Sequence, residues 1–252
     1  MYKGLSVGAV IPAYDEEANI GPVVTALLDL RTDGGHRVID DLVVCDNGST
    51  DATAARAQAA GARVVVEETR GYGMACLTAL AALDPVDVVL FVDGDQSCDV
   101  LQALDLLEAI ADGADLAIGS RALGRMEQGA LSMPQIAGNR VASLLIRLLW
   151  GRVVTDLGPF RAIRADALKR LDMRDIAYGW TVEMQVKAIQ WNMRLVETPV
   201  NTLRRRFGIS KVGGTLKGVA GASIGILGMI ARLRCRRVDS GTTRDNKEEE
   251  RS

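Results

Sequence analysis

The chain is poor in aromatic residues and in histidine, and these shortages argue against several kinds of site. Of its 252 residues, 4% are aromatic, and His36 is the only histidine, in a Gly-Gly-His-Arg loop. A catalytic triad that uses histidine, or a metal site built on histidines, is therefore nearly excluded. We interpret His36 as a solvated loop residue.

The cysteines do not form a disulfide framework or a zinc site by spacing. The chain has four, with no CxxC pair and no regular interval between them. We interpret them as small buried or incidental side chains in a reducing compartment. They are Cys45, Cys76, Cys98 and Cys235.

A secretion signal and a long apolar run are also missing. The N-terminus lacks a basic start with a long apolar centre, and no stretch reaches the ~18 apolar residues of a membrane-spanning helix. The net charge of −2 at pH 7 indicates no particular partner and gives no sign of nucleic acid binding. We expect a cytoplasmic catalytic part, and the length suits one large α/β domain.

Short apolar, β-branched runs alternate with helical patterns through the first half of the chain. This alternation predicts a mainly parallel central sheet flanked by helices. The predicted strands are Val7–Ile11, Asp41–Cys45, Ala62–Glu67, Val86–Val92 and Asp115–Ile118, and the predicted helices are Glu17–Leu30, Asp51–Ala60, Tyr72–Leu83 and Val100–Ile110.

The second half is less regular. Helical spacing predicts helices over Asn139–Trp150 and Thr181–Trp191, and Leu195–Pro199 has the features of an edge strand ended by proline. We expect Gly124–Gly138 to be a mobile loop, and Asp239–Ser252, which is polar and charged, to be disordered.

Polar clusters follow three of the predicted strands. They are Pro12–Glu16, Asp46–Ser49 and Asp93–Asp95, and ligands of parallel sheets bind outside the carboxyl ends of the strands. Two carboxylates separated by Gly94 offer the hard oxygen ligands that Mg²⁺ or Mn²⁺ prefers. A solvated acidic turn is the alternative interpretation of that pair, and the other two clusters favour a site.

Five segments resemble motifs of the family 2 glycosyltransferases, in the family's order. The last two are typical of the branch that contains dolichyl-phosphate mannose synthase and polyprenyl-phosphate glycosyltransferases. The resemblance covers residues 5–215. The segments are Val10–Glu17 (VIPAYDEE, for VIPAYNEE), Val44–Asp51 (VCDNGSTD, for VDDGSTD), Phe91–Asp95 (the DxD motif), Gly119–Arg121 (GSR) and Arg205–Lys211 (R-x-x-G-x-S-K).

The resemblance implies a GT-A fold, an inverting reaction, a UDP- or GDP-sugar donor and a divalent metal held by Asp93 and Asp95. Asp95 is the better metal ligand, Asp93 supports the ribose or the metal through water, and Asp46 faces the nucleobase. The residues expected around the donor are Pro12, Ala13, Tyr14, Glu16, Asp46, Gly48, Ser49, Asp93, Gly94 and Gln96.

The same resemblance selects basic partners for phosphate. With Asp95, the predicted catalytic residues are Arg121, Arg205 and Lys211, because arginine binds phosphate in bidentate fashion. We interpret Arg140, near a family acceptor-phosphate position, as a solvated surface residue.

Some positions stay open at this point. The segment Asp156–Ala162 is one residue tighter than the family's DxxSGFRA, so Asp156 is not assigned the family aspartate's role. Glu183 is a general base only for a hydroxyl acceptor, and we favour a helix residue in a salt bridge. Gly71 and Gly73 either cap the following helix or leave room beside the nucleotide. The QxxRW motif of processive polysaccharide synthases is absent, which argues against a polymerase.

The last part of the chain is basic. Residues 198–238 contain no acidic side chain, and Gly218–Ala231 is mostly small and apolar. We predict a basic amphipathic helix over residues 216–238 that contacts an anionic membrane surface. The alternative is a helix that packs on the domain and has basic ends.

These observations predict a glycosyltransferase domain over residues 1–215 that moves a sugar from a nucleotide-diphospho-sugar to a polyprenyl phosphate. We expect it in the cytoplasm, with peripheral contact at the inner face of the plasma membrane. One alternative is a soluble glycosyltransferase acting on a small-molecule or glycan hydroxyl. Another is a nucleotide-sugar-binding module without turnover.

Overall fold

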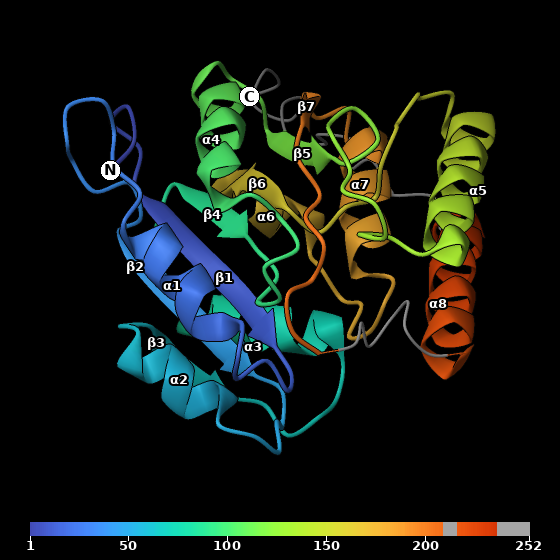
Figure 1. Cartoon of the computed structure of the whole chain (residues 1–252). Coiled ribbons are helices and arrows are strands. Elements are labelled where there is room, and N and C mark those ends of the chain that lie inside the picture. The colour runs from blue at the N-terminus through green and yellow to red at the C-terminus, as the bar shows by residue number, and fades with distance from the viewer. Residues whose placement is uncertain (209–215, 236–252) are drawn as a thin grey trace, which may run out of the picture.

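The protein, described by a computed structural model over residues 1–208 and 216–235, is built on a seven-stranded sheet. The strand order is β3-β2-β1-β4-β6-β5-β7 (Figure 1). The strands are β1 (Val7–Ala13), β2 (Asp41–Asp46), β3 (Arg63–Val66), β4 (Val88–Phe91), β5 (Leu116–Ser120), β6 (Arg161–Arg164) and β7 (Leu195–Pro199).

The first four strands form a parallel half-sheet, as the sequence predicts. β1 lies between β2 and β4, so that Val10 is opposite Val43 on one side and Phe91 on the other. β2 pairs in parallel with β3. The first two strands extend farther than expected, which makes Pro12 and Ala13 part of β1 and not of the loop after it.

The other half of the sheet contains a strand that the sequence analysis missed. β6 runs antiparallel between β4 and β5. Its four residues, RAIR, are too few and too charged to stand out as a buried strand. β7 pairs in parallel with β5 at the end of the sheet, which confirms the predicted edge strand.

Helices cover both faces of the sheet, and alternate strand residues face each side. Val7, Ala9 and Ile11 pack with α1 and α4, whereas Val10 packs with α3, α6 and α7. The helices are α1 (Ile20–Leu28), α2 (Thr53–Ala59), α3 (Tyr72–Ala82), η1 (Val100–Gln102), α4 (Ala103–Ala111), α6 (Ala165–Leu171) and α7 (Trp180–Gln190).

Two further helices, α5 (Met133–Trp150) and α8 (Leu216–Cys235), lie beside each other at one edge of the molecule (Figure 1). α5 begins inside the segment predicted to be a loop, so that prediction is wrong from Met133 onward. The helix begins there because Ser132 and Gln135 form a capping box, which provides partners for backbone N–H groups at its start. Pro134, which favours the beginning of a helix, lies in the same first turn.

Buried residues of α8 join α5 and α7 in a third apolar cluster. Met229, Ile230 and Leu233 pack with Ile146 of α5 and Val182 of α7. Gly221 and Gly225 of α8 lie close to Tyr178, since a Cβ on them would lie 3.6 and 3.4 Å from its side chain. This packing agrees with the alternative interpretation of a helix on the domain with basic ends.

Within the described ranges, no helix is long and apolar enough to cross a bilayer. The predicted disordered tail and residues 236–238 of the predicted basic helix lie outside the described residues.

Candidate active site

The carboxyl ends of β1 and β4 border a cavity with a volume of about 1330 Å³. Its other walls come from the start of α3, the segments that follow β5 and β7, and helices α5 and α8. The cavity brings together many of the residues that the sequence analysis selected. Those in its lining are Pro12, Ala13, Tyr14, Glu16, Asp93, Gly94, Asp95, Arg121 and Arg205.

The acidic pair lies just beyond β4. Asp93 accepts a hydrogen bond of 3.0 Å from the Tyr72 hydroxyl, and Asp95 accepts one of 3.0 Å from the backbone N–H of Ser97. Enclosure by protein and the neighbouring Asp95 carboxylate raise the pKa of Asp93 to about 7. This strand end therefore holds more negative charge than its surroundings neutralise.

Gly94 is the residue that brings the two carboxylates so close to β1. A Cβ there would lie 3.0 Å from Ile20 Cδ1 and 3.4 Å from Ile11 Cγ2. A side chain at position 94 would be tight against Ile20, so glycine lets the turn pack closely on the sheet.

Arg205 is the basic residue that reaches the acidic pair. Its Nη1 lies 3.2 Å from Asp95, its Nη2 forms an ion pair with Glu16, and its Nε donates to the Phe207 carbonyl at 2.8 Å. Arg205 thus serves as the positive partner of these two carboxylates. Lys211, the other basic residue of that motif, lies outside the described residues.

The residues at this strand end fit a divalent cation that is shared with a ligand. The described residues contain no cluster of three or more His, Cys, Asp or Glu side chains that would hold a metal alone. Mg²⁺ is usually held by one or two carboxylates together with substrate phosphates. Asp95 and Asp93, with their excess negative charge, offer that incomplete ligand set.

Of the second predicted cluster, Asn47 lines the cavity, whereas Asp46, Gly48 and Ser49 lie beside it. Asp46 is buried and accepts hydrogen bonds from the backbone N–H and the hydroxyl of Ser49. Gly48 adopts a left-handed backbone (φ +70°), and its carbonyl accepts from Arg70 Nη2 at 2.8 Å. Gln96 points toward Asn19, with Nε2 3.4 Å from its side-chain oxygen. The contacts of Asp46, Gly48, Ser49 and Gln96 with a nucleotide-sugar donor stay predictions.

Two cavity residues received no role in the sequence analysis, Asn47, which lies within the second predicted cluster, and Arg70, which was not selected. The Arg70 guanidinium lies 3.7 Å from the centroid of the Tyr14 ring. Asn47 accepts from the backbone N–H of Gly71 at 2.8 Å and donates to the Thr69 carbonyl at 2.8 Å, which fixes the segment that carries Arg70. The sequence contained one indication that Arg70 lies near the site, since its segment follows β3, the neighbour of β2 in the sheet.

Gly71 and Gly73 have a role that neither sequence interpretation describes in full. Gly71 is the N-cap of α3, but a Cβ on it would lie 2.0 Å from the Ile176 carbonyl oxygen. A Cβ on Gly73 would lie 2.0 Å from that of Asp175. Both glycines are required because the segment between α6 and α7 lies directly on the start of α3.

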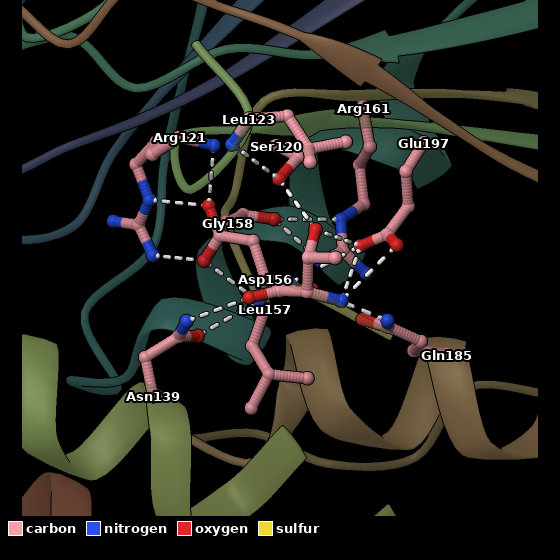
Figure 2. Close-up of polar contacts among 11 residues, drawn as sticks. Ser120, Arg121, Leu123, Asn139, Asp156, Leu157, Gly158, Arg161, Gln185 and Glu197 are labelled. Carbon is pink, nitrogen blue, oxygen red and sulfur yellow. Dashed lines mark hydrogen bonds and ion pairs between the residues drawn. The ribbon is translucent and has the colours of Figure 1, made fainter. Parts of the chain in front are cut away.

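Arg121 and Asp156 form a two-pronged ion pair at the opposite wall of the cavity (Figure 2). Arg121 Nε and Nη2 lie 2.8 and 2.7 Å from the two carboxylate oxygens, and the Arg121 backbone N–H donates at 2.8 Å. Burial acts to lower the pKa of Arg121, but its bonds to Asp156 outweigh this and raise the pKa. Asp156, left unassigned above, therefore positions a permanently charged arginine.

A network of hydrogen bonds holds Asp156 in turn, as Figure 2 shows. Glu197 of β7 accepts from the backbone N–H groups of Thr155 and Asp156 at 2.8 and 3.1 Å. Asn139 of α5 accepts from the backbone N–H of Leu157 at 2.9 Å. The arginine is thus braced by residues of β7 and α5, two elements that are far apart in sequence.

The structure shows the contacts of Glu183 and the location of Arg140. Glu183 pairs with Lys187 at 2.7 Å and accepts from the backbone N–H of Asp175 at 2.7 Å, which confirms the salt-bridge interpretation. Arg140 lies exposed on α5 and outside the cavity lining, in agreement with a surface residue.

Comparison with known proteins adds independent information. The profile described as "Glycosyl transferase family 2" matches residues 9–172. An uncharacterized glycosyltransferase of Mycobacterium tuberculosis is 35% identical over 218 residues, which cover 85% of this chain and 93% of the relative. An undecaprenyl-phosphate mannosyltransferase of Micrococcus luteus is 31% identical over 237 residues, covering 90% of this chain and 96% of the relative.

Among solved structures, glucosyl-3-phosphoglycerate synthase from Mycobacterium tuberculosis, in complex with Mn²⁺, UDP and phosphoglyceric acid, is similar with a TM-score of 0.72. It is 24% identical, and the match covers 94% of this chain and 81% of that one. This likeness concerns the fold. With the profile match and the full-length relatives, it shows that the chain belongs to glycosyltransferase family 2 and is a glycosyltransferase of GT-A fold.

Proposed function

We propose that this enzyme transfers a sugar from a UDP- or GDP-sugar to a polyprenyl phosphate, with inversion and with Mg²⁺ or Mn²⁺ as cofactor. One observation carries the proposal. A single cavity has the acidic pair and three arginines in its lining, together with apolar residues of α5 and α8. A charged donor and a lipid-linked acceptor require those two environments side by side.

At the donor end, Asp95 and Asp93 hold the cation, and Pro12, Ala13, Tyr14, Glu16 and Gly94 surround the nucleotide. When bound there, the cation would supply positive charge that offsets the negative charge of the departing nucleoside diphosphate. Asp46, Gly48, Ser49 and Gln96 support this wall from behind. When the donor binds, Arg205 leaves its ion pairs with Glu16 and Asp95 and binds a donor phosphate. Lys211 is the other basic residue of the same motif.

At the acceptor end, Arg121 binds the phosphate of the acceptor. Two of its nitrogens are held by Asp156, and among the described residues Nη1 has no hydrogen-bond partner. A phosphate oxygen forms a bond to the anomeric carbon while the bond from that carbon to the diphosphate oxygen breaks, and the electron pair leaves with the nucleoside diphosphate. The acceptor is already an anion, so no general base is required.

The relatives support the acceptor class. The Micrococcus luteus relative is named for undecaprenyl phosphate and covers nearly the whole chain. A polyprenyl phosphate lies in a membrane, and we therefore infer that the enzyme works at the inner face of the plasma membrane. A soluble glycosyltransferase with a small-molecule or glycan hydroxyl acceptor is the competing assignment.

A donor screen by thermal unfolding, followed by transfer assays, tests the proposal. UDP- and GDP-sugars are added with and without Mn²⁺, and a ligand at a hundred times its dissociation constant should stabilise the fold by about 2.7 kcal/mol. The selected donor is then offered to a short-chain prenyl phosphate and to soluble sugars and phosphoglycerate. Transfer to the prenyl phosphate is expected, and faster transfer to a soluble acceptor would contradict the proposal.

A further inference from the structure

The outer face of α5 is apolar, although no described residue covers it. Met133, Val141, Leu144 and Leu148 have side chains 75, 50, 54 and 70% exposed. Their spacing of three, four or eight residues places them on one side of the helix. The opposite side is buried through Ala142 and Ile146. This helix therefore has two apolar faces, of which only one packs on the protein.

The neighbouring helix α8 repeats the pattern. Ile224 and Leu227 are 73 and 44% exposed, while Ala222, Met229 and Leu233 are buried. Ala231, one turn after Leu227, is also exposed. Because the two helices pack side by side, their outer residues extend one apolar area over two elements.

The charge on these two helices has one sign. α5 contains Arg140 and Arg147, α8 contains Lys217, Arg232 and Arg234, and neither helix contains an aspartate or glutamate. The whole chain nevertheless has a net charge of −2. The four arginines are exposed, and no ion pair joins them to a described residue. Positive charge is thus concentrated around the exposed apolar residues.

The exposed apolar residues of the two helices also reach the cavity. Val141 and Leu227 are each about half exposed, and both line the cavity. The apolar surface and the active site are therefore continuous.

We propose that the outer faces of α5 and α8 together form a docking surface for an anionic lipid bilayer, which brings the cavity beside the two helices onto the membrane. The surface consists of Met133, Val141, Leu144, Leu148, Ile224 and Leu227 with their flanking arginines. This inference rests on the proposed function for one point only, which is why the cavity beside these helices should face lipid.

Charge favours a bilayer over a second copy of this chain. A two-fold dimer brings the same patch of both subunits together, and here it would place arginines against arginines without carboxylates to pair them. Anionic headgroups supply the missing negative charge, at about a fivefold gain in binding for each cation near the surface. Apolar side chains then enter the boundary between headgroups and acyl chains.

Vesicle flotation with the full-length protein tests this surface. The vesicles are phosphatidylcholine alone or phosphatidylcholine mixed with phosphatidylglycerol, and they contain no prenyl phosphate. Binding is expected to the mixed vesicles and to weaken as salt is added. The double variant Leu144→Glu/Leu148→Glu should lower the partition coefficient by at least about tenfold.

Two matched controls accompany these variants. Leu101→Glu introduces one glutamate at a side chain that is 67% exposed on η1, and it should bind as the wild type does. Arg140→Gln/Arg147→Gln should lose about fivefold in binding for each arginine, whereas Arg56→Gln on α2 should lose none. Two results would overturn the docking surface. One is vesicle binding by Leu144→Glu/Leu148→Glu that equals wild-type binding, and the other is a wild-type dimer that this double variant dissociates.

Failure of this inference is distinguishable from failure of the proposed function. Transfer to a short-chain prenyl phosphate in detergent-free solution does not require a membrane. A protein that performs this transfer but ignores both kinds of vesicle refutes the docking surface alone. A protein that binds the mixed vesicles through Leu144 and Leu148 but transfers sugar to no prenyl phosphate refutes the proposed acceptor alone.

Discussion

The cavity wall beside β1 and β4 consists of strand ends, whereas the opposite wall consists of helices and connecting segments from the second half of the chain. On the first wall, Tyr14, Asp93 and Asp95 follow buried strands within a few residues. On the second, Arg121 depends on Asp156, which depends on Asn139 and Glu197. In the proposed function the strand-end wall binds the charged donor, and the wall of helices and connecting segments binds the acceptor.

The strongest way to break this comparison is to remove Asp95, the metal ligand that we propose for the strand-end wall. Asp95→Ala should lower transfer roughly a thousandfold, because the leaving diphosphate loses the charge that a bound cation supplies. Steady-state rates with Mn²⁺ measure the effect. Asp112→Ala, an exposed aspartate after α4, is the control and should retain full activity. Near-normal turnover in Asp95→Ala would show that this wall is not the donor site.

Asp156→Asn tests the opposite wall. The change leaves Arg121 without its carboxylate in a place where Asp156 is 1% exposed, and it should lower the free energy of unfolding by about 3 kcal/mol. The KM for the acceptor should rise while the dissociation constant of the nucleotide stays the same. Urea unfolding, acceptor kinetics and nucleotide titration measure the three quantities. Asp166→Asn, which is exposed on α6, should change none of them.

An equal loss of nucleotide affinity in Asp156→Asn would contradict the division of the cavity into two walls. A loss of stability without any change in the acceptor KM would reduce Asp156 to a purely structural residue.

Arg205 connects the two walls, and its removal sharpens the comparison. Because it pairs with Asp95 and Glu16, it competes with a cation for the same carboxylates. Arg205→Ala should therefore bind Mn²⁺ about fivefold more tightly in the absence of nucleotide, while transfer becomes slower. Calorimetric titration measures the affinity, and Arg206→Ala, the exposed neighbour, is the control. Weaker Mn²⁺ binding in Arg205→Ala would mean that Arg205 organises the metal site.

The raised pKa of Asp93 predicts a pH dependence with a definite sign. Its folded value of about 7 lies above the ordinary value of 3.8, so between the two the folded protein binds more protons than the unfolded one. The contribution of this group to stability is present at low pH and declines as pH rises through that window. Urea unfolding at about pH 5 and about pH 8, compared with Asp93→Asn, measures it. An identical pH dependence in both proteins would contradict the assignment.

The smallest expected effect concerns Arg70, which lies over the Tyr14 ring. Cation–π contacts at exposed sites contribute about 0.5–1 kcal/mol. Arg70→Ala should weaken nucleotide binding by no more than about fivefold, as measured by titration. A far larger loss would indicate that Arg70 contacts the phosphates directly.

The sequence predicts the strand-end wall well because its information is local. The runs Val7–Ile11 and Val88–Val92 are continuous and contain no polar side chain, and the polar residues that follow them lie within the same few positions. β6 could not be predicted from four residues with a charge at each end, since its place is fixed by pairing with β4 and β5. The start of α5 was readable in principle, since Ser132 and Gln135 have capping-box spacing.

The partners of Arg121 and Arg205 belong to the part that the sequence cannot reveal. Asp156 is 35 residues from Arg121, and Glu16 is 189 residues from Arg205, and no local pattern joins either pair. The same holds for Gly71 and Gly73, whose need for glycine comes from a segment a hundred residues later in the chain. Such contacts are set by packing of whole elements, which periodicity does not encode.

One assay tests the central claim, that the acidic strand end and the apolar helices serve a single transfer reaction. The preferred donor, labelled in its sugar, is incubated with the enzyme, Mn²⁺ and a polyprenyl phosphate, and the products are extracted into organic solvent. We expect the label in the organic phase as an acid-labile lipid-linked sugar, with none when Asp95→Ala replaces the wild type. Label that stays in the donor, or that moves faster to a water-soluble acceptor, would contradict the account.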